Sequence, residues 1–324
     1  MRVLIIGAAG MIGRKLTAKL GGSLGKPIEH LTLADVVAPA IPADFPDADI
    51  RTADISQPGA AASLLDGRPD LIFHLAAIVS GEAEADLEKG YRINLDGTRE
   101  LFDAIRLIPD YTPRVVFTSS LAVFGAPFPD AIGDDFHLTP LTSYGTQKAM
   151  GELLLADYSR RGFFDGVGIR LPTICIRPGL PNKAASSFFS GILREPLSGH
   201  EAVLPVADTL RHWFASPRAA VGMLLHAATL DSAPLGARRT LSMPGLSATV
   251  GDQIEALRRV AGEKAVRLIR RQPDPAVQAI VSGWPQRFDA TRATSLGFTA
   301  ETSFDDIIRA HIDDELGGSI GAAA

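Results

Sequence analysis

The sequence predicts an α/β protein with a doubly wound parallel sheet and a smaller C-terminal lobe. Over residues 1–172, short apolar runs alternate with helical patterns, which is typical of parallel strands joined by helices. The first run, Val3–Ile6, passes directly into a glycine-rich turn at residues 7–13. After Pro172 this alternation weakens and prolines become frequent. We therefore expect one domain at 1–172, to which some later segments return, and a second domain at 173–324.

The composition excludes several classes of protein. Of the 324 residues, 46% are hydrophobic and 21% are charged, and the net charge is −5, so nothing indicates a surface for nucleic acid or an anionic membrane. The apolar run at residues 71–79 is interrupted by His74 and is too short to span a bilayer. Cys175 is the single cysteine, which excludes an intrachain disulfide and favours the cytoplasm. No Cys/His cluster has metal-ligand spacing, so we expect no metal.

The glycine turn has the context of a dinucleotide-binding site, because it follows a buried strand and opens a helix. Residues without side chains let the backbone approach a pyrophosphate, whose charge then lies at the helix N-terminus. The next strand, residues 31–34, ends at Asp35, which lies 22 residues after Gly13. A carboxylate there accepts hydrogen bonds from the adenosine ribose and repels a 2′-phosphate. NAD is therefore predicted in preference to NADP.

The remaining elements of the first domain follow the same alternation. The helix expected at 143–160 has Ser143 as its N-cap, and the helix expected at 87–105 carries Asn94. The segment at 124–142 is rich in Gly, Pro and Asp and is predicted to be irregular. We expect further strands at 48–52, 70–75, 114–117 and 167–171, and a further helix at 58–65.

Tyr144 and Lys148 are four residues apart, so on a helix their side chains leave the same face. A free tyrosine has a pKa of about 10 and is a poor base at neutral pH. A nearby ammonium and a bound oxidised nicotinamide both favour the phenolate. The pair therefore predicts a general base for an alcohol that loses hydride.

Taken together, these motifs resemble the extended short-chain dehydrogenase/reductase family of NAD-dependent epimerases and dehydratases, over nearly the whole chain. The resemblance implies a Rossmann-type fold and NAD as the cofactor. It also implies that Ser120 orients the substrate hydroxyl, Tyr144 takes its proton and Lys148 binds the nicotinamide ribose. The cofactor contacts that it implies, with those of the catalytic Tyr144 and Lys148, are at Gly7, Gly10, Met11, Ile12, Gly13, Asp35, Asp54, Ile55, Ala76, Ala77 and Asn94.

Three stretches, at residues 77–82, 169–174 and 181–186, are similar to those family members that oxidise a four-carbon sugar acid at the hydroxyl next to its carboxylate. Such a substrate needs a cation, for which Arg177, Lys183 and Arg211 are candidates. Thr173 stands where nucleotide-sugar enzymes often have Asn, which argues against inherited sugar-nucleotide contacts. The substrate contacts that we expect are Ser80, Ser120, Thr173, Asn182, Lys183 and Arg211.

Two alternatives remain open. The same site could return the hydride and so act as a nucleotide-sugar epimerase, although no nucleotide-binding signature is visible in the second domain. A catalytically silent dinucleotide-binding regulator could keep the glycine turn, but Ser120, Tyr144 and Lys148 are intact. The family resemblance further implies a homodimer formed through the helices that carry Asn94 and Tyr144.

Overall fold

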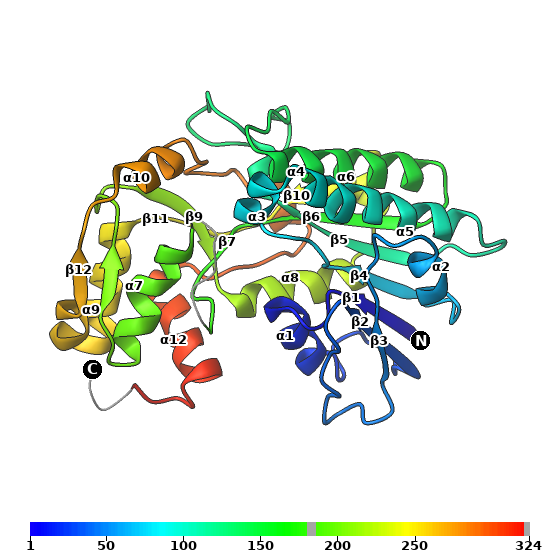
Figure 1. Ribbon diagram of the computed structural model, residues 1–324, viewed down its shortest axis with the longest axis horizontal. Coiled ribbons are helices and arrows are strands. Elements are labelled where there is room, and N and C mark those ends of the chain that lie inside the picture. The colour runs from blue at the N-terminus through cyan, green and yellow to red at the C-terminus, as the bar shows by residue number, and fades with distance from the viewer. Residues whose placement is uncertain (180–185, 321–324) are drawn as a thin grey trace. The chain divides into compact units, whose positions relative to one another are not determined.

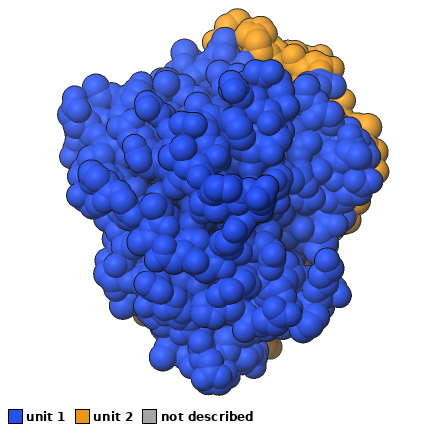
Figure 2. All heavy atoms as spheres, turned by 90° about the vertical axis from the view of Figure 1, so that its right-hand side faces the viewer, with its two compact units in different colours: residues 1–124, 138–171, 221–243 blue, residues 125–137, 172–220, 244–324 orange. Residues whose placement is uncertain are grey.

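The computed structural model describes residues 1–179 and 186–320, and the chain forms two compact units (Figure 2). Each unit is assembled from three separate stretches of the sequence. Unit 1 comprises Met1–Phe124, Leu138–Leu171 and Val221–Met243, and unit 2 comprises Gly125–His137, Pro172–Ala220 and Pro244–Ala324.

Unit 1 contains a seven-stranded sheet in the order β10-β6-β5-β4-β1-β2-β3, with every pair parallel. The order reverses between β1 and β4, as it does in doubly wound sheets that bind dinucleotides. This confirms the predicted fold class. The strands are β1 (Arg2–Ile6), β2 (His30–Asp35), β3 (Asp49–Thr52), β4 (Leu71–His74), β5 (Arg114–Ser120), β6 (Asp165–Leu171) and β10 (Thr240–Ser242).

Helices cover both faces of this sheet, with α5 and α6 on one side and α1 on the other (Figure 1). Strands β1 and β4 are therefore buried on both faces and read as continuous apolar runs. The helices of this part of the chain are α1 (Met11–Lys19), α2 (Ala60–Leu64), α3 (Ser80–Ala85), α4 (Leu87–Gly90), α5 (Gly97–Arg106), α6 (Ser143–Arg160) and α8 (Pro217–Thr229), with the π-helical segment η1 (Tyr91–Asp96) and the 3₁₀ turn η2 (Leu121–Val123).

An aromatic cluster fixes α5 and α6 against the sheet. Phe102 from α5, Phe117 from β5 and Phe164 before β6 are each at most 1% exposed, and their ring centroids lie 4.9–6.4 Å apart around Phe102. Burying a side chain of this size contributes about 1.5–3 kcal/mol. This cluster determines how α6, which carries Tyr144 and Lys148, lies on β5.

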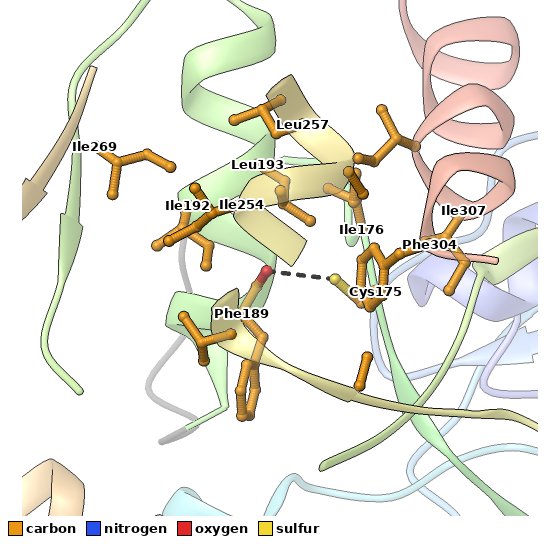
Figure 3. Packing of buried hydrophobic residues seen from close by; sticks show 14 of the residues in the cluster. Cys175, Ile176, Phe189, Ile192, Leu193, Ile254, Leu257, Ile269, Phe304 and Ile307 are labelled. Atoms are coloured by element: carbon orange, nitrogen blue, oxygen red, sulfur yellow. Dashed lines mark hydrogen bonds between the residues drawn. The ribbon is translucent and has the colours of Figure 1, made fainter. Parts of the chain in front are cut away.

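Unit 2 has its own core, part of which Figure 3 shows. Cys175 is fully buried there, and its thiol donates to the carbonyl of Phe189 at 3.3 Å. The strands form the sheets β11-β9-β7 and β12-β8. The elements are β7 (Thr173–Ile174), α7 (Ser187–Leu197), β8 (Ala202–Leu204), β9 (Arg211–Ala215), the 3₁₀ turn η3 (Ala233–Leu235, on the unit 1 stretch), β11 (Leu246–Thr249), α9 (Val250–Arg267), β12 (Ile269–Arg271), α10 (Pro275–Ser282), α11 (Thr291–Ser295) and α12 (Phe304–Glu315).

The structure corrects three local predictions. The helix expected at 87–105 is interrupted by η1, which inserts extra residues into the helical turn around Asn94. The N-cap of α6 is Thr142, whose hydroxyl accepts from the backbone N–H of Gly145, so Ser143 is the first helical residue. β5 continues to Ser120, because its ladder with β6 extends over Thr118, Ser119 and Ser120.

Candidate active site

The glycine turn between β1 and α1 has no room for side chains at two positions. Gly7 has a φ of 93°, and a Cβ there would lie 2.7 Å from the backbone nitrogen of Ala76. A Cβ on Gly13 would lie 2.2 Å from the carbonyl oxygen of Gly7. The turn therefore packs directly under the N-terminus of α1, where backbone N–H groups are available to an anion. This cradle fits the pyrophosphate of a dinucleotide.

Asp35, at the end of β2, fastens the turn to the neighbouring strand. Its carboxylate accepts from the backbone N–H of Ala9 at 2.9 Å and from that of Val37 at 3.4 Å. Gly7 also donates to the carbonyl of Ala34 at 2.8 Å. Asp35, the residue predicted to bind the ribose, thus lies at the carboxyl edge of the sheet beside the glycine turn. This position fits NAD.

The residues predicted around the adenine differ in their surroundings. Asp54 accepts hydrogen bonds from the hydroxyl and N–H of Ser56 and from Gln57. Burial raises its pKa, but these hydrogen bonds outweigh burial and hold it below its ordinary value. Ile55 is 3% exposed and packs into the core, where a Cβ on Gly97 would lie 2.9 Å from its Cγ2. The predicted contact of Ile55 with the adenine is therefore restricted to its backbone.

Asn94 holds the loop that follows β4. Its side chain accepts from the N–H of Ile78 at 2.9 Å and donates to the carbonyl of the same residue at 3.2 Å. It also donates to the side-chain oxygen of the buried Gln147 at 2.8 Å. Ala76 and Ala77 precede this clamp, and Ser80 begins α3 directly after it. Asn94 therefore fixes the backbone between the predicted cofactor and substrate contacts.

Three contacts fix the first turn of α6 in addition to the aromatic cluster. Thr142 caps the helix, and the carboxylate of Glu84 accepts from the backbone N–H of Ser143 at 2.9 Å. A Cβ on Gly145 would lie 2.1 Å from the carbonyl oxygen of Ala122, so helix and turn are in direct backbone contact. This contact places Tyr144 beside the end of β5.

Tyr144 and Ser120 meet at this point. Burial raises the pKa of Tyr144 to about 12, and a hydrogen bond with Ser120 opposes the rise. The hydroxyl of Ser120 also accepts from the N–H of Ala122 at 3.2 Å. Burial is the larger of these two effects, so the phenol is protonated at neutral pH.

Lys148 is 3% exposed, and its Nζ donates to the carbonyl of Thr118 at 2.8 Å. The ammonium lies 5.0 Å from the ring centroid of Phe117 and 5.8 Å from that of Tyr144. Burial lowers the pKa of Lys148 to about 8, although the carboxylate of Glu152 opposes this effect. Lys148 is therefore mainly protonated at neutral pH, but its pKa lies only slightly above that pH.

The substrate residues predicted in unit 2 are only partly described. The hydroxyl of Thr173 lies 2.7 Å from Nε2 of His212, whose Nδ1 is bonded to the carbonyl of Pro285. Arg211 donates to the carbonyl of Ser247 at 3.1 Å. Asn182 and Lys183 lie outside the described residues.

Arg177 is half-buried, and its guanidinium donates to the hydroxyl of Ser186 at 3.2 Å. A surface hollow of about 510 Å³ in unit 2, lined by Trp213, Phe288 and Thr291 among others, contains none of the predicted site residues.

Two residues that the sequence analysis did not single out lie beside the site. Gln147 is fully buried against Asn94, and Glu152 is buried one helical turn beyond Lys148. The spacing of 144, 148 and 152 could have revealed Glu152, because residues four apart share a helix face. Within the described ranges, no group of three or more His, Cys, Asp or Glu side chains is arranged to hold a metal. No helix among those residues is both long and apolar enough to cross a bilayer.

A glycine cradle, a carboxylate at the ribose position and a Tyr–Lys pair at the carboxyl edge of a doubly wound sheet define an NAD-dependent oxidoreductase of the short-chain type. The chain belongs to the NAD dependent epimerase/dehydratase family, whose model matches residues 3–234.

Among relatives, a protein named D-erythronate dehydrogenase from Cupriavidus necator is 49% identical, over 97% of this chain and 98% of its own. A protein of the same name from Haemophilus influenzae is 43% identical, over 98% of this chain and 100% of its own. The crystal structure of a protein described as a nucleoside-diphosphate-sugar epimerase from Agrobacterium tumefaciens is 68% identical with a TM-score of 0.96, and covers 98% of this chain and 95% of its own.

Proposed function

We propose that this protein is an NAD-dependent dehydrogenase that oxidises the 2-hydroxyl of D-erythronate to give 2-dehydro-D-erythronate. The observation that carries the proposal is the meeting of Tyr144, Ser120 and Lys148 at the carboxyl edge of the same sheet that carries the glycine cradle. Two relatives that match nearly the whole chain bear the name of this activity.

In the proposed reaction, the phenolate of Tyr144 takes the proton of the substrate hydroxyl. Bound NAD supplies the acceptor for the hydride that leaves carbon 2, so that the carbon–oxygen bond becomes a ketone. Ser120 donates a hydrogen bond to the reacting oxygen and orients it. Lys148 stabilises the phenolate by its charge, since an ammonium close by favours the ionised form of a phenol.

The charge balance of the site depends on NAD. In the chain without cofactor, the pKa of Tyr144 is about 12, so the phenol is protonated at neutral pH. A cationic nicotinamide ring lowers that pKa in the same direction as Lys148 does. We therefore propose that the phenolate of Tyr144 is stabilised by Lys148 together with the cationic ring of oxidised NAD, and that Tyr144 holds its proton for the reverse reaction when the nicotinamide ring is reduced and uncharged.

For the substrate carboxylate we propose Arg211, because a guanidinium binds carboxylates through two parallel hydrogen bonds. Nη1 of Arg211 donates a hydrogen bond to the carbonyl of Ser247. Nη2 lies 3.9 Å from the carboxylate of Asp252, which is long for an ion pair, so the guanidinium can still donate hydrogen bonds to a ligand. Ser80, Thr173, Asn182 and Lys183 remain the proposed contacts for the other substrate oxygens.

A panel of four-carbon sugar acids and nucleotide sugars, assayed for NADH at saturating NAD, tests the proposal. We expect NADH to accumulate with D-erythronate and not with nucleotide sugars. The competing function, nucleotide-sugar epimerisation, is favoured by the description of the Agrobacterium relative. It predicts turnover of a nucleotide sugar without NADH accumulation. A dinucleotide-binding regulator predicts NAD binding without turnover of any member of the panel.

We also propose that the protein is a cytoplasmic homodimer. The side chains of Met150 and Leu153 on α6 and Leu107 after α5 are 39%, 65% and 67% exposed, although they are apolar. Apolar residues on the outer face of adjacent helices favour burial against a second copy. Sedimentation of the purified chain, compared with a Leu153→Glu variant, tests this assembly.

A further inference from the structure

Three consecutive residues at the end of β5 each contact one residue on a single face of α6. The carbonyl of Thr118 accepts from Lys148, and Ser120 is bonded to Tyr144. Between them, the hydroxyl of Ser119 donates to the carboxylate of Glu152 at 2.5 Å. Tyr144, Lys148 and Glu152 are spaced by four, so they lie in one row along the helix. Glu152 thus lies on the same face of α6, and contacts the same end of β5, as the two residues that act in the proposed reaction.

Glu152 is bound on its other side by Arg170 from β6. The carboxylate accepts from Nε at 2.9 Å and from Nη2 at 2.7 Å, and both side chains are at most 7% exposed. The guanidinium also donates to Ser242 at 3.3 Å and lies 4.9 Å from the ring centroid of Phe124. A buried ion pair is often no more stabilising than apolar residues of the same volume, because desolvation offsets the attraction. Stability alone therefore gives a poor reason for this charge.

We propose that Glu152 is a positioning residue for Lys148, whose buried carboxylate, held by Ser119 and Arg170, keeps the neighbouring ammonium charged beside Tyr144. The inference rests on the proposed function and adds a third member to the row on α6. It assigns Glu152 no contact with the substrate or NAD. Hydrogen bonds from Arg170 and Ser119 fix the position of the carboxylate, and Arg170 supplies two of them.

The electrostatics around Lys148 agree with this role. Burial lowers its pKa to about 8, and the carboxylate of Glu152 acts in the opposite direction. The other titratable groups that face it are the phenol of Tyr144, the cation Arg170 and His74 from β4, which is neutral because burial lowers its pKa to about 3. Glu152 is therefore the anion among these facing groups.

Charged groups on the remaining elements that pack against α6 have other partners or are exposed. Arg114 and Asp165 form an ion pair where β5 and β6 begin, at the end of these strands that lies away from Ser120. Asp103 of α5 accepts a hydrogen bond from Tyr158, and Glu84 of α3 accepts one from the backbone of Ser143. The other charged residues of these helices are Glu82, Lys89 (paired with Glu82), Glu88, Arg92, Asp96, Arg99, Glu100 and Arg106.

The test follows the Lys148 ammonium directly, by NMR of the full chain labelled at the lysine Cε carbons, without NAD or substrate. A Lys148→Met variant identifies the signal. In wild type we expect a midpoint near pH 8. Glu152→Gln should move it down by about 1 pH unit, since it removes an opposite charge one helical turn away from the ammonium. Ser119→Ala, which removes the hydroxyl and keeps the carboxylate, is the matched control and should leave the midpoint unchanged or slightly lower.

A midpoint in Glu152→Gln equal to that of wild type overturns the inference. If this variant does not fold, because Arg170 is left buried without a counter-charge, the paired variant Glu152→Gln with Arg170→Gln replaces it. The pair removes both charges and leaves two amides able to bond each other. Because loss of the Arg170 cation by itself raises the midpoint, the paired variant is compared with Arg170→Gln alone. A lower midpoint in the paired variant than in Arg170→Gln supports the role of Glu152, and equal midpoints contradict it.

Kinetics separate this role from a merely structural one. In the active enzyme, the alkaline limb of kcat should move to lower pH in Glu152→Gln by the same shift as the NMR midpoint, with KM little changed. A structural role lowers kcat at every pH without moving the limb. If no sugar acid yields NADH even in wild type, the proposed function fails, whereas the NMR titration still decides whether Glu152 keeps Lys148 charged.

Discussion

At the scale of single residues, the site places two ionisable groups where burial opposes the charged form of each. The pKa of Tyr144 is raised to about 12 and that of Lys148 is lowered to about 8. The phenol therefore releases its proton only when positive charge gathers around it. In the proposed reaction, the cationic ring of oxidised NAD supplies part of that charge, so the interior does not hold a buried phenolate before the cofactor binds.

Replacing Tyr144 by Phe removes the proton acceptor and leaves the glycine cradle intact. We expect kcat for NADH formation to fall by about 10²–10⁴-fold, the range of general base catalysis, while NAD binding measured by calorimetry is retained. Tyr158→Phe is the control, because Tyr158 lies on the same helix and bonds Asp103 away from the site. Turnover of Tyr144→Phe near the wild-type rate would exclude the tyrosine as base.

Asp35 should govern the choice between NAD and NADP. Asp35→Asn keeps an oxygen that can accept from Ala9 and removes the charge that repels a 2′-phosphate. We expect the ratio of kcat/KM for NAD over NADP to fall at least about tenfold, since juxtaposed like charges cost several kcal/mol. Asp49→Asn, at an exposed ion pair with Arg51, should not change the ratio. An unchanged ratio in Asp35→Asn would place the cofactor preference elsewhere.

At the scale of elements, the position of α6 relative to β5 decides the site. Gly145 brings the helix into backbone contact with Ala122, and Gly151 packs on the ring of Phe117, where a Cβ would lie 2.8 Å from the ring. The row of Tyr144, Lys148 and Glu152 can meet the end of β5 because the helix approaches this closely. Gly145 and Gly151 therefore set the position of the candidate site through packing.

Gly145→Ala should displace the first turn of α6, because its Cβ would lie 2.1 Å from the carbonyl oxygen of Ala122. We expect a loss of about 1–3 kcal/mol in the free energy of unfolding and a reduced kcat, measured by urea denaturation and NADH formation. Gly222→Ala is the control, since Gly222 lies in α8 at a position where an added Cβ would meet open space. Alanine there should stabilise the helix by up to about 1 kcal/mol. Equal effects of the two substitutions would contradict this explanation.

The sequence predicts elements well where one local pattern decides them. β1, β2 and β4 follow from buried apolar runs, and the cradle follows from Gly7 and Gly13. The π-helical segment around Asn94 could not be predicted, because the clamp on Ile78 involves residues distant in sequence. Thr142 and Ser143 are both good N-caps, so only the hydrogen bond to Gly145 distinguishes them.

The chain after Pro172 was less predictable for a related reason. The helical segment α9, which is kinked at Gly262, lies in the part of the chain where the alternation of strand and helix patterns weakens. β10 has three residues and joins the sheet through its pairing with β6, which no local pattern announces. In the candidate site, the common helix face of Tyr144 and Lys148 follows from their spacing, whereas the contacts of Glu152 with Ser119 and Arg170 depend on how strands and helix pack.

At the scale of the whole molecule, buried histidines should make the protein sensitive to acid. Burial lowers the pKa of His74 to about 3 and that of His212 to about 4, both below the ordinary value of 6.5. Between pH 6.5 and 4 the unfolded chain binds these protons and the folded chain does not. Stability is therefore complete above pH 6.5 and falls as the pH drops through this window.

The expected slope is about 1.4 kcal/mol per pH unit for each histidine. Urea denaturation at pH 7, 6 and 5 measures it, and His74→Gln should reduce the slope by about half. His137→Gln, at an exposed position, is the control. A free energy of unfolding that is constant between pH 7 and 5 would contradict the buried, neutral state of both rings.

The late position of β10 has a consequence for how the chain is synthesised. The sheet of unit 1 begins with β1 at Arg2 and lacks its last strand until Ser242 has left the ribosome. At typical rates of elongation this interval is about 10–50 s. For the last part of it, about 4–14 s after Leu171 has been synthesised, β6 is an exposed parallel edge and Arg170 lacks its hydrogen bond to Ser242. A nascent chain stalled before residue 240 should therefore expose β6 as an unpaired edge strand that chaperones can bind. Synthesis of the few residues of β10 should cover this edge by pairing with β6.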